Sequence, residues 1–194
     1  MSSMANWTTG NGELLEVRKR KMVFRLKPTY VVEHVTDINL EDLKAEGIRG
    51  LIFDLDNTIM APKTGELTKE VEGWLNVVKN DFKISIVSNN PREHYVQEAA
   101  QLVGAPAYAK AKKPGTEVAA KALKEMDLLP SQVVMIGDRP LTDIWVGQRL
   151  GMITILVDPL IKHEEIAIVK FLRKLERIFI ERPKKIFTHH KKGD

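Results

Sequence analysis

The sequence has no cysteine, few aromatic residues and no long apolar run. Without cysteine there can be no disulfide bond, thiolate nucleophile or cysteine-ligated zinc, and this absence fits a reducing compartment such as the cytoplasm. No apolar stretch approaches the ~18 residues that a membrane-spanning helix needs. The first residues also lack the charged and then apolar layout of a secretory signal. We therefore expect a protein kept in a reducing, aqueous compartment.

At 194 residues and 43% hydrophobic content, the chain can form one substantial core. Residues 1–12 are rich in Ser, Thr, Asn and Gly and are expected to be disordered. We expect one domain over 13–160, which begins with a basic lead-in. A basic amphipathic helix and tail are expected over 161–194. The basic residues of the lead-in are Arg18, Lys19, Arg20, Lys21, Arg25 and Lys27.

The C-terminal residues 161–194 carry ten Lys or Arg against five Asp or Glu, a net +5. Because the whole chain carries +4, the rest of it carries −1. Helical spacing places the apolar residues of this segment on one face: Ile168, Phe171, Leu172, Leu175, Ile178 and Phe179. Such a helix packs on the sheet or on a partner subunit, or lies on an anionic membrane surface. Nucleic acid is disfavoured because the chain has no recognisable motif or stacking platform for it.

The stretch 51–60, LIFDLDNTIM, delivers two carboxylates at the end of an apolar run. Because side chains alternate along a strand, Asp54 and Asp56 point the same way. Open α/β sheets bind ligands at the carboxyl ends of their strands. This stretch therefore indicates a buried strand that leads into a functional site.

Three later segments repeat the pattern of an apolar run followed by polar residues. Residues 84–87 lead into Ser88 and Asn89, a basic loop carries Lys113, and residues 133–136 lead into Asp138 and then Asp143. Strands that alternate with helices of about ten residues predict an α/β fold with a doubly wound, parallel, five-stranded Rossmann-like sheet. All four segments would then meet at one edge of that sheet.

The helices are expected at capping and periodicity signals. One begins after Asn39, one covers 68–79, one takes Asn90 as N-cap and Pro91 as first residue, one covers 116–126, and one begins at Asp143. Short strands are expected at 106–109 and 152–157 in addition to those above.

The residue types at this edge suit phosphoryl transfer. Asp54 can attack phosphorus, and Asp56 can protonate the leaving oxygen and later activate water. Asp54 and Asp138 supply the hard oxygen ligands that Mg²⁺ prefers. Ser88 can donate a hydrogen bond to a phosphoryl oxygen, and Lys113 can neutralise its charge.

These motifs resemble those of the haloacid-dehalogenase-like (HAD) phosphatases: D-x-D-x-T at 54–58, then Ser88, Lys113, and Asp138 with Asp143. The run from about 38 to 159 is similar to the YqeG-type proteins of subclass IIIA, which include phosphatidylglycerophosphate phosphatases. The resemblance implies a strand order of 5-4-1-2-3 and Mg²⁺ held by Asp54, Asp138 and the main-chain carbonyl of Asp56. It implies that Asp143 supports the metal indirectly, and that Arg139 and Pro140 carry no chemistry. The substrate contacts it implies are Thr58, Ser88, Asn89 and Lys113.

The spacing between motifs leaves no room for a cap domain, which indicates an open site, covered by oligomerisation or acting on a bulky substrate. The leading interpretation is a phosphomonoesterase that converts phosphatidylglycerophosphate to phosphatidylglycerol, associated peripherally with a membrane. Two alternatives stay open: a phosphatase for a soluble sugar phosphate, nucleotide or phosphoprotein, and a non-catalytic phosphate-binding scaffold.

Overall fold

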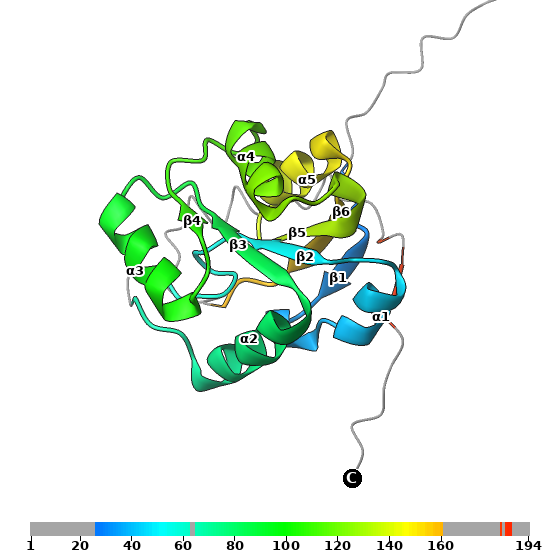
Figure 1. The fold of residues 1–194 in the computed structure, drawn as a ribbon, viewed down its shortest axis with the longest axis horizontal. Helices are drawn as coiled ribbons and strands as arrows, with labels where there is room; N and C mark the ends of the chain where they lie inside the picture. Colours follow the sequence, from blue (N-terminus) through cyan, green and yellow to red (C-terminus); the bar gives the residue numbers. More distant parts are fainter. Residues whose placement is uncertain (1–25, 63–64, 161–182, 184, 188–194) are drawn as a thin grey trace, which may run out of the picture.

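The computed structural model describes residues 26–62, 65–160, 183 and 185–187 (Figure 1). Its centre is a six-stranded parallel sheet in the order β1-β6-β5-β2-β3-β4. The strands are β1 (Tyr30–Val32), β2 (Gly50–Phe53), β3 (Lys83–Val87), β4 (Ala107–Tyr108), β5 (Val133–Gly137) and β6 (Ile153–Val157). Every residue of β2 and β5 is buried, as expected for central strands covered on both faces.

The prediction of five strands was wrong by one. The five expected strands are present as β6-β5-β2-β3-β4, in the expected order, and β1 adds a sixth at the edge beside β6. β1 is only three residues long, too short for a periodic pattern, and follows the basic lead-in directly. Thr29 and Thr154 fix it by exchanging hydrogen bonds through their side chains and backbone N–H groups, at 3.1 and 3.2 Å.

Five α-helices cover the two faces of the sheet among the described residues: α1 (Leu40–Ala45), α2 (Lys69–Asp81), α3 (Glu93–Val103), α4 (Glu117–Met126) and α5 (Trp145–Leu150). The helices α1, α2 and α3 pack on one face and α4 and α5 on the other (Figure 1). The sheet is thus the middle of three layers, which is the doubly wound arrangement that the sequence predicts.

The structure confirms one predicted helix cap and contradicts two predicted helix starts. Asn39 accepts hydrogen bonds from backbone N–H groups of the first turn of α1, and Thr68 does so for α2. The predicted start of α3 at Asn90 and Pro91 was wrong, because α3 begins at Glu93 and the Asn90 side chain is used elsewhere. Asp143 does not begin a helix either: it lies inside a short π-helical turn, Pro140–Ile144, that precedes α5.

Among the described residues, the connections between β2, β3 and β4 are short. The chain between β2 and β3 contributes α2 alone, and the chain between β3 and β4 contributes α3 alone. None of the helices described is long and apolar enough to cross a membrane. Residues 1–12 and the predicted C-terminal helix lie outside the described residues.

Candidate active site

The three central strands bring three motif residues to one edge of the sheet. Asp54 follows β2, Ser88 follows β3 and Asp138 follows β5, and β2 lies between the other two. The backbone N–H of Asp54 donates to the carbonyl of Ile136 at 2.8 Å, which continues the β2–β5 pairing to the point where the motif begins. Parallel pairing therefore sets these side chains next to one another, as the sequence predicts.

A pocket of about 330 Å³ opens at this edge. It is lined by residues from the loops that follow β2, β3, β4 and β5. These are Asp54, Asp56, Asn57, Pro62, Ser88, Asn89, Asn90, Arg92, Lys113, Asp138, Arg139 and Thr142.

Lys113 joins two of the acids. Its Nζ lies 2.6 Å from Asp54 Oδ1 and 2.7 Å from Asp143 Oδ1, and its side chain is only 1% exposed. Burial alone would lower the pKa of Lys113, but the charges of Asp143 and Asp54 and their hydrogen bonds outweigh it, so the pKa is raised. Lys113 is therefore a fixed cation beside the predicted nucleophile.

The three buried acids leave the site with excess negative charge. Ligand oxygens of Asp54, Asp138 and Asp143 lie within 4.8 Å of one another. Burial raises the pKa of Asp54, and the charges of Asp143 and Asp56 add to this rise against the opposing effect of Lys113. Three carboxylates against one ammonium leave two negative charges, which a divalent cation would balance. The hard oxygen donors suit such an ion.

Asp56 is held at both of its carboxylate oxygens. Asn90 Nδ2 donates to Oδ2 at 2.9 Å, and the Tyr95 hydroxyl donates to Oδ1 at 2.9 Å. Both partners come from the segment that follows β3, Tyr95 from the first turn of α3. These bonds fix the direction in which Asp56 faces the pocket.

Asn89 positions the lysine loop. The backbone N–H of Lys113 donates to Asn89 Oδ1 at 2.7 Å, and Asn89 Nδ2 donates back to the Lys113 carbonyl at 3.0 Å. Ser88 supports the same loop, because its carbonyl accepts a hydrogen bond from Ala111. The Ser88 hydroxyl accepts from the backbone N–H of Asn90 at 3.1 Å and can donate its own proton into the pocket.

Most of the predicted site residues meet at this pocket. Asp54, Asp56, Ser88, Asn89, Lys113 and Asp138 line it, and Asp143 lies behind Lys113, fully buried. Asp143 Oδ2 also accepts a hydrogen bond from the backbone N–H of Arg139 at 3.0 Å. Thr58 is buried and does not line the pocket, so its contact with substrate stays a prediction.

Sequence reasoning missed several residues at this site. Asn90 was interpreted as a helix cap and Tyr95 was given no role, yet both hold Asp56. Arg139 was expected to carry no chemistry, but it lines the pocket together with Arg92. The only local signal was the position of these residues within or just after a motif.

The fold and this acid, lysine and serine cluster define a HAD-type phosphatase. The chain belongs to the mitochondrial PGP phosphatase family, which matches residues 16–161.

The chain is 35% identical over 151 residues to the "Probable phosphatase YqeG" of Bacillus subtilis, covering 77% of this chain and 87% of that protein. It is 32% identical over 175 residues to "Phosphatidylglycerophosphate phosphatase 1, chloroplastic/mitochondrial" of Arabidopsis thaliana, covering 86% of this chain and 49% of that protein. The chain thus spans about half the length of the Arabidopsis relative. A solved structure of an uncharacterised protein from Listeria monocytogenes serotype 4b shares the fold, with 19% identity, a TM-score of 0.50, and coverage of 70% of this chain and 90% of that one.

Proposed function

We propose that this phosphatase removes the terminal phosphate of phosphatidylglycerophosphate, giving phosphatidylglycerol and inorganic phosphate, with Mg²⁺ as its metal. The observation that carries the chemistry is the placement of Asp54 beside the buried Lys113, with Asp56 fixed close by at both oxygens. The lipid substrate is supported by the family and by the name of the Arabidopsis relative.

In the first step, an Asp54 carboxylate oxygen attacks phosphorus and the bond from phosphorus to the glycerol oxygen breaks. Asp56 acts as general acid and gives a proton to the departing oxygen. Lys113 and the Ser88 hydroxyl bind the phosphoryl oxygens whose charge increases during transfer. The product of this step is an aspartyl-phosphate at Asp54 and the free alcohol of phosphatidylglycerol.

In the second step, Asp56 takes a proton from a water molecule, which attacks the phosphorus of the aspartyl-phosphate. The bond from phosphorus to Asp54 breaks and inorganic phosphate leaves. Because Asn90 and Tyr95 hold both oxygens of Asp56, the same carboxyl group faces the reacting oxygen in both steps.

Asp54, Asp138 and the main-chain carbonyl of Asp56 would hold Mg²⁺, with Asp143 and Lys113 balancing charge around it. When bound, the ion would neutralise charge so that an anionic nucleophile can approach an anionic ester.

The size of the pocket supports a reaction at a lipid surface. A volume of about 330 Å³ is at the small end of ligand pockets and suits a phosphorylated glycerol head group, with the acyl chains left outside. Leu160 lies beside the site, because its backbone N–H donates to the carbonyl of Asn57 at 3.1 Å. Because the basic segment 161–182 follows Leu160 directly in the sequence, we propose that this segment contacts anionic lipid.

The test is hydrolysis of phosphatidylglycerophosphate in detergent micelles by purified protein with Mg²⁺, compared with a panel of sugar phosphates, nucleotides and a phosphopeptide. We expect kcat/KM to be highest for the lipid and activity to vanish in Asp54→Asn. A higher kcat/KM for any soluble ester would contradict the lipid as substrate and indicate that ester instead. Binding of phosphate without hydrolysis of any ester would indicate a scaffold instead.

A further inference from the structure

The pocket contains a cation that the proposed chemistry does not use. Arg92 lines the pocket from the exposed turn that precedes α3. Lys113, by comparison, is already bound to two carboxylates and faces the transferred phosphate. Arg92 is therefore available for another part of the substrate.

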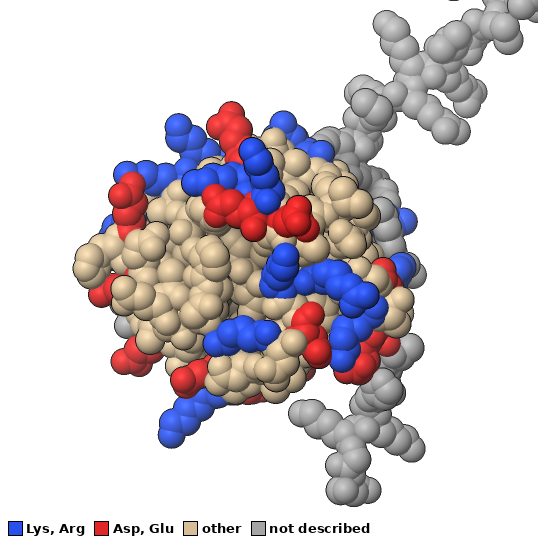
Figure 2. Space-filling model, in the orientation of Figure 1, with Lys and Arg blue, Asp and Glu red and all other residues tan. Residues whose placement is uncertain are grey.

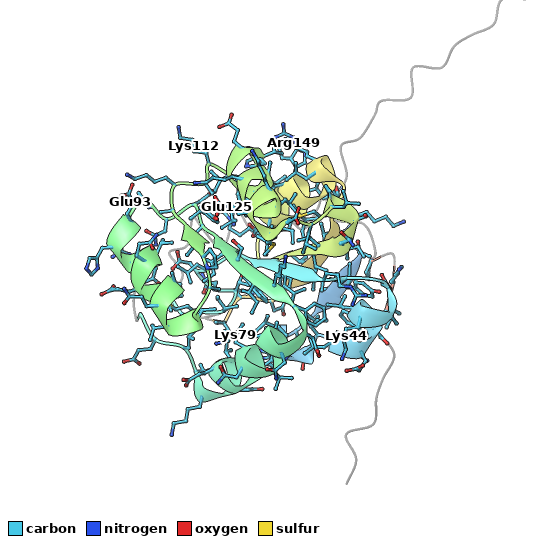
Figure 3. The ribbon with its side chains drawn as sticks, viewed as in Figure 1. Lys44, Lys79, Glu93, Lys112, Glu125 and Arg149 are labelled. Carbon is cyan, nitrogen blue, oxygen red and sulfur yellow. The ribbon has the colours of Figure 1, made fainter. Side chains whose placement is uncertain are left out.

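Arg92 has no acidic partner within the part of the chain that the structure describes. Its neighbour Glu93 pairs with Lys110 at 2.8 Å, which ties the start of α3 to the loop after β4. Figure 3 labels Glu93 at the start of α3. A charged guanidinium without a carboxylate partner, placed in a pocket for a phosphate ester, is suited to bind an anion of the substrate.

Two contacts place Arg92 next to the acid of the first step. Its guanidinium carbon lies 5.2 Å from the centre of the Tyr95 ring, and Tyr95 donates to Asp56. Its backbone N–H donates to Asn90 Oδ1 at 3.0 Å, and Asn90 also donates to Asp56. Both links of Arg92 thus converge on Asp56.

The position beside Asp56 identifies the part of the substrate that reaches Arg92. Asp56 protonates the leaving oxygen, so the group attached to that oxygen leaves the reaction centre on the Asp56 side. From this geometry we infer that Arg92 binds a second anionic group, carried by the leaving alcohol and not transferred. This inference rests on the proposed function only for the role of Asp56, and it adds a requirement: the preferred substrate has a second phosphate a few bonds beyond the ester that is cleaved.

The chemistry of the proposed lipid meets that requirement. In phosphatidylglycerophosphate, one glycerol links the terminal phosphomonoester to a phosphodiester. The diester belongs to the leaving alcohol, and its charge persists in the product. Arg92 would thus distinguish this head group from a simple phosphomonoester of similar size.

The experiment compares two soluble esters that differ only by the second phosphate, glycerol bisphosphate and glycerol monophosphate. We expect the wild-type protein to prefer the bisphosphate, and Arg92→Gln to lower the ratio of the two kcat/KM values about tenfold, mainly through KM for the bisphosphate. Arg92→Lys should keep part of the preference because it keeps the charge. The matched control is Lys121→Gln, since Lys121 also lies over a tyrosine ring, that of Tyr108 at 5.1 Å, but outside the pocket.

An equal loss on both esters in Arg92→Gln, no change on either, or no preference in the wild type would overturn the inference. Short-chain phosphatidylglycerophosphate, assayed in parallel, separates this inference from the proposed function. Hydrolysis of that lipid with an unchanged ratio in Arg92→Gln rejects the role of Arg92 alone. A protein that does not cleave the lipid but loses its bisphosphate preference in Arg92→Gln keeps the second-anion site and rejects the lipid.

Discussion

At the scale of single residues, the site is organised around one buried lysine. Lys113 contacts the proposed nucleophile Asp54 on one side and Asp143 on the other. Leaving either acid without this partner would strand a buried charge, which typically costs about 3–5 kcal/mol. The lysine therefore contributes to the stability of the acid cluster, in addition to its proposed role in binding phosphate.

Asp138 provides a direct test of the metal. Asp138→Asn keeps the shape of the side chain but removes a charged ligand, so the Mg²⁺ concentration for half-maximal activity should rise about tenfold or more. The measurement is the rate as a function of added Mg²⁺. Asp127→Asn, at the exposed end of α4, is the control and should leave the curve unchanged. An unaltered curve for Asp138→Asn would remove this residue from the metal ligands.

Substitution of Asn89 tests whether activity requires Lys113 to be held in position by its loop. Asn89→Ala removes both hydrogen bonds to the Lys113 backbone, so kcat/KM should fall about tenfold or more because the ammonium shifts away from the phosphate. Asn89→Asp keeps the acceptor for the Lys113 N–H and should retain more activity than Asn89→Ala. If Asn89→Ala kept wild-type kcat/KM, the loop would hold Lys113 without this side chain.

The sequence predicts the residues proposed to act on phosphorus better than it predicts the residues that hold them in place. Asp54, Ser88, Lys113 and Asp138 each follow a strong strand or a motif, so the chain itself marks them. Tyr95 acquires its role only because the fold brings the first turn of α3 next to Asp56, and such a contact between distant segments leaves no local pattern. Asn90 was misinterpreted for a related reason. A capping rule that considers only nearby residues expects its side chain to bond to the first turn of the helix, but the amide group instead bonds to Asp56 and to the backbone N–H of Arg92.

At the scale of secondary structure elements, the end of β5 is the tightest part of the site. A Cβ atom added at Gly137 would lie 2.3 Å from the carboxyl carbon of Asp143. The π-helical turn that follows brings Asp143 back against its own strand, and this requires a glycine at that point. Packing between β5 and this turn thus fixes the acid that supports Lys113.

Gly137→Ala should therefore destabilise the fold by about 2 kcal/mol or more and lower activity, because Asp143 must move. Gly73→Ala is the matched control: Gly73 lies in the exposed middle of α2 with nothing within 4 Å of an added Cβ. That change should stabilise the protein by about 0.5–1 kcal/mol. Denaturant unfolding of both variants measures this. Equal stability of the two would show that the end of β5 has more space than the structure indicates.

The boundaries of the helices and strands show which features can be predicted from neighbouring residues and which cannot. The five expected strands and the cap at Asn39 were predictable, because apolar runs and capping residues are recognised over a few residues of sequence. Strand β1 was missed because its stability comes from pairing with β6, not from its own sequence. The turn around Asp143 was taken as a helix start because nothing local reveals that its carboxylate turns inward to a lysine.

At the scale of the whole molecule, positive charge is concentrated in one part of the sequence, whereas both signs of charge are mixed on one face of the folded domain. On the face shown in Figure 2, Lys and Arg are interspersed with Asp and Glu. The excess positive charge of the sequence lies in 161–194. Two residues of this segment contact the start of β1 and the end of α1: Phe187 stacks on Tyr30 with ring centres 4.1 Å apart, and Lys185 Nζ pairs with Glu46 at 2.7 Å.

A test of membrane binding must preserve those contacts, so truncation after Leu160 is unsuitable. Instead, four cations of the proposed apolar and basic helix are changed to Gln together: Lys170, Arg173, Lys174 and Arg177. Binding to vesicles that contain anionic lipid should weaken strongly, since each charge contributes about 1 kcal/mol, and added salt should weaken wild-type binding. Vesicle sedimentation measures this, with hydrolysis of glycerol monophosphate as the control. Unaltered vesicle binding by the variant would contradict the role of these four cations, and a wild-type protein that does not bind vesicles would favour a helix packed on the core or on a partner subunit.

The covalent role of Asp54 is the central claim, and acid quenching during turnover tests it most directly. Wild-type protein mixed with radiolabelled phosphatidylglycerophosphate and Mg²⁺ is quenched in acid, digested and examined by mass spectrometry. We expect labelled phosphate on the peptide that contains Asp54, and none in Asp54→Asn. Turnover without any labelled peptide, or with label on a different residue, would contradict the mechanism.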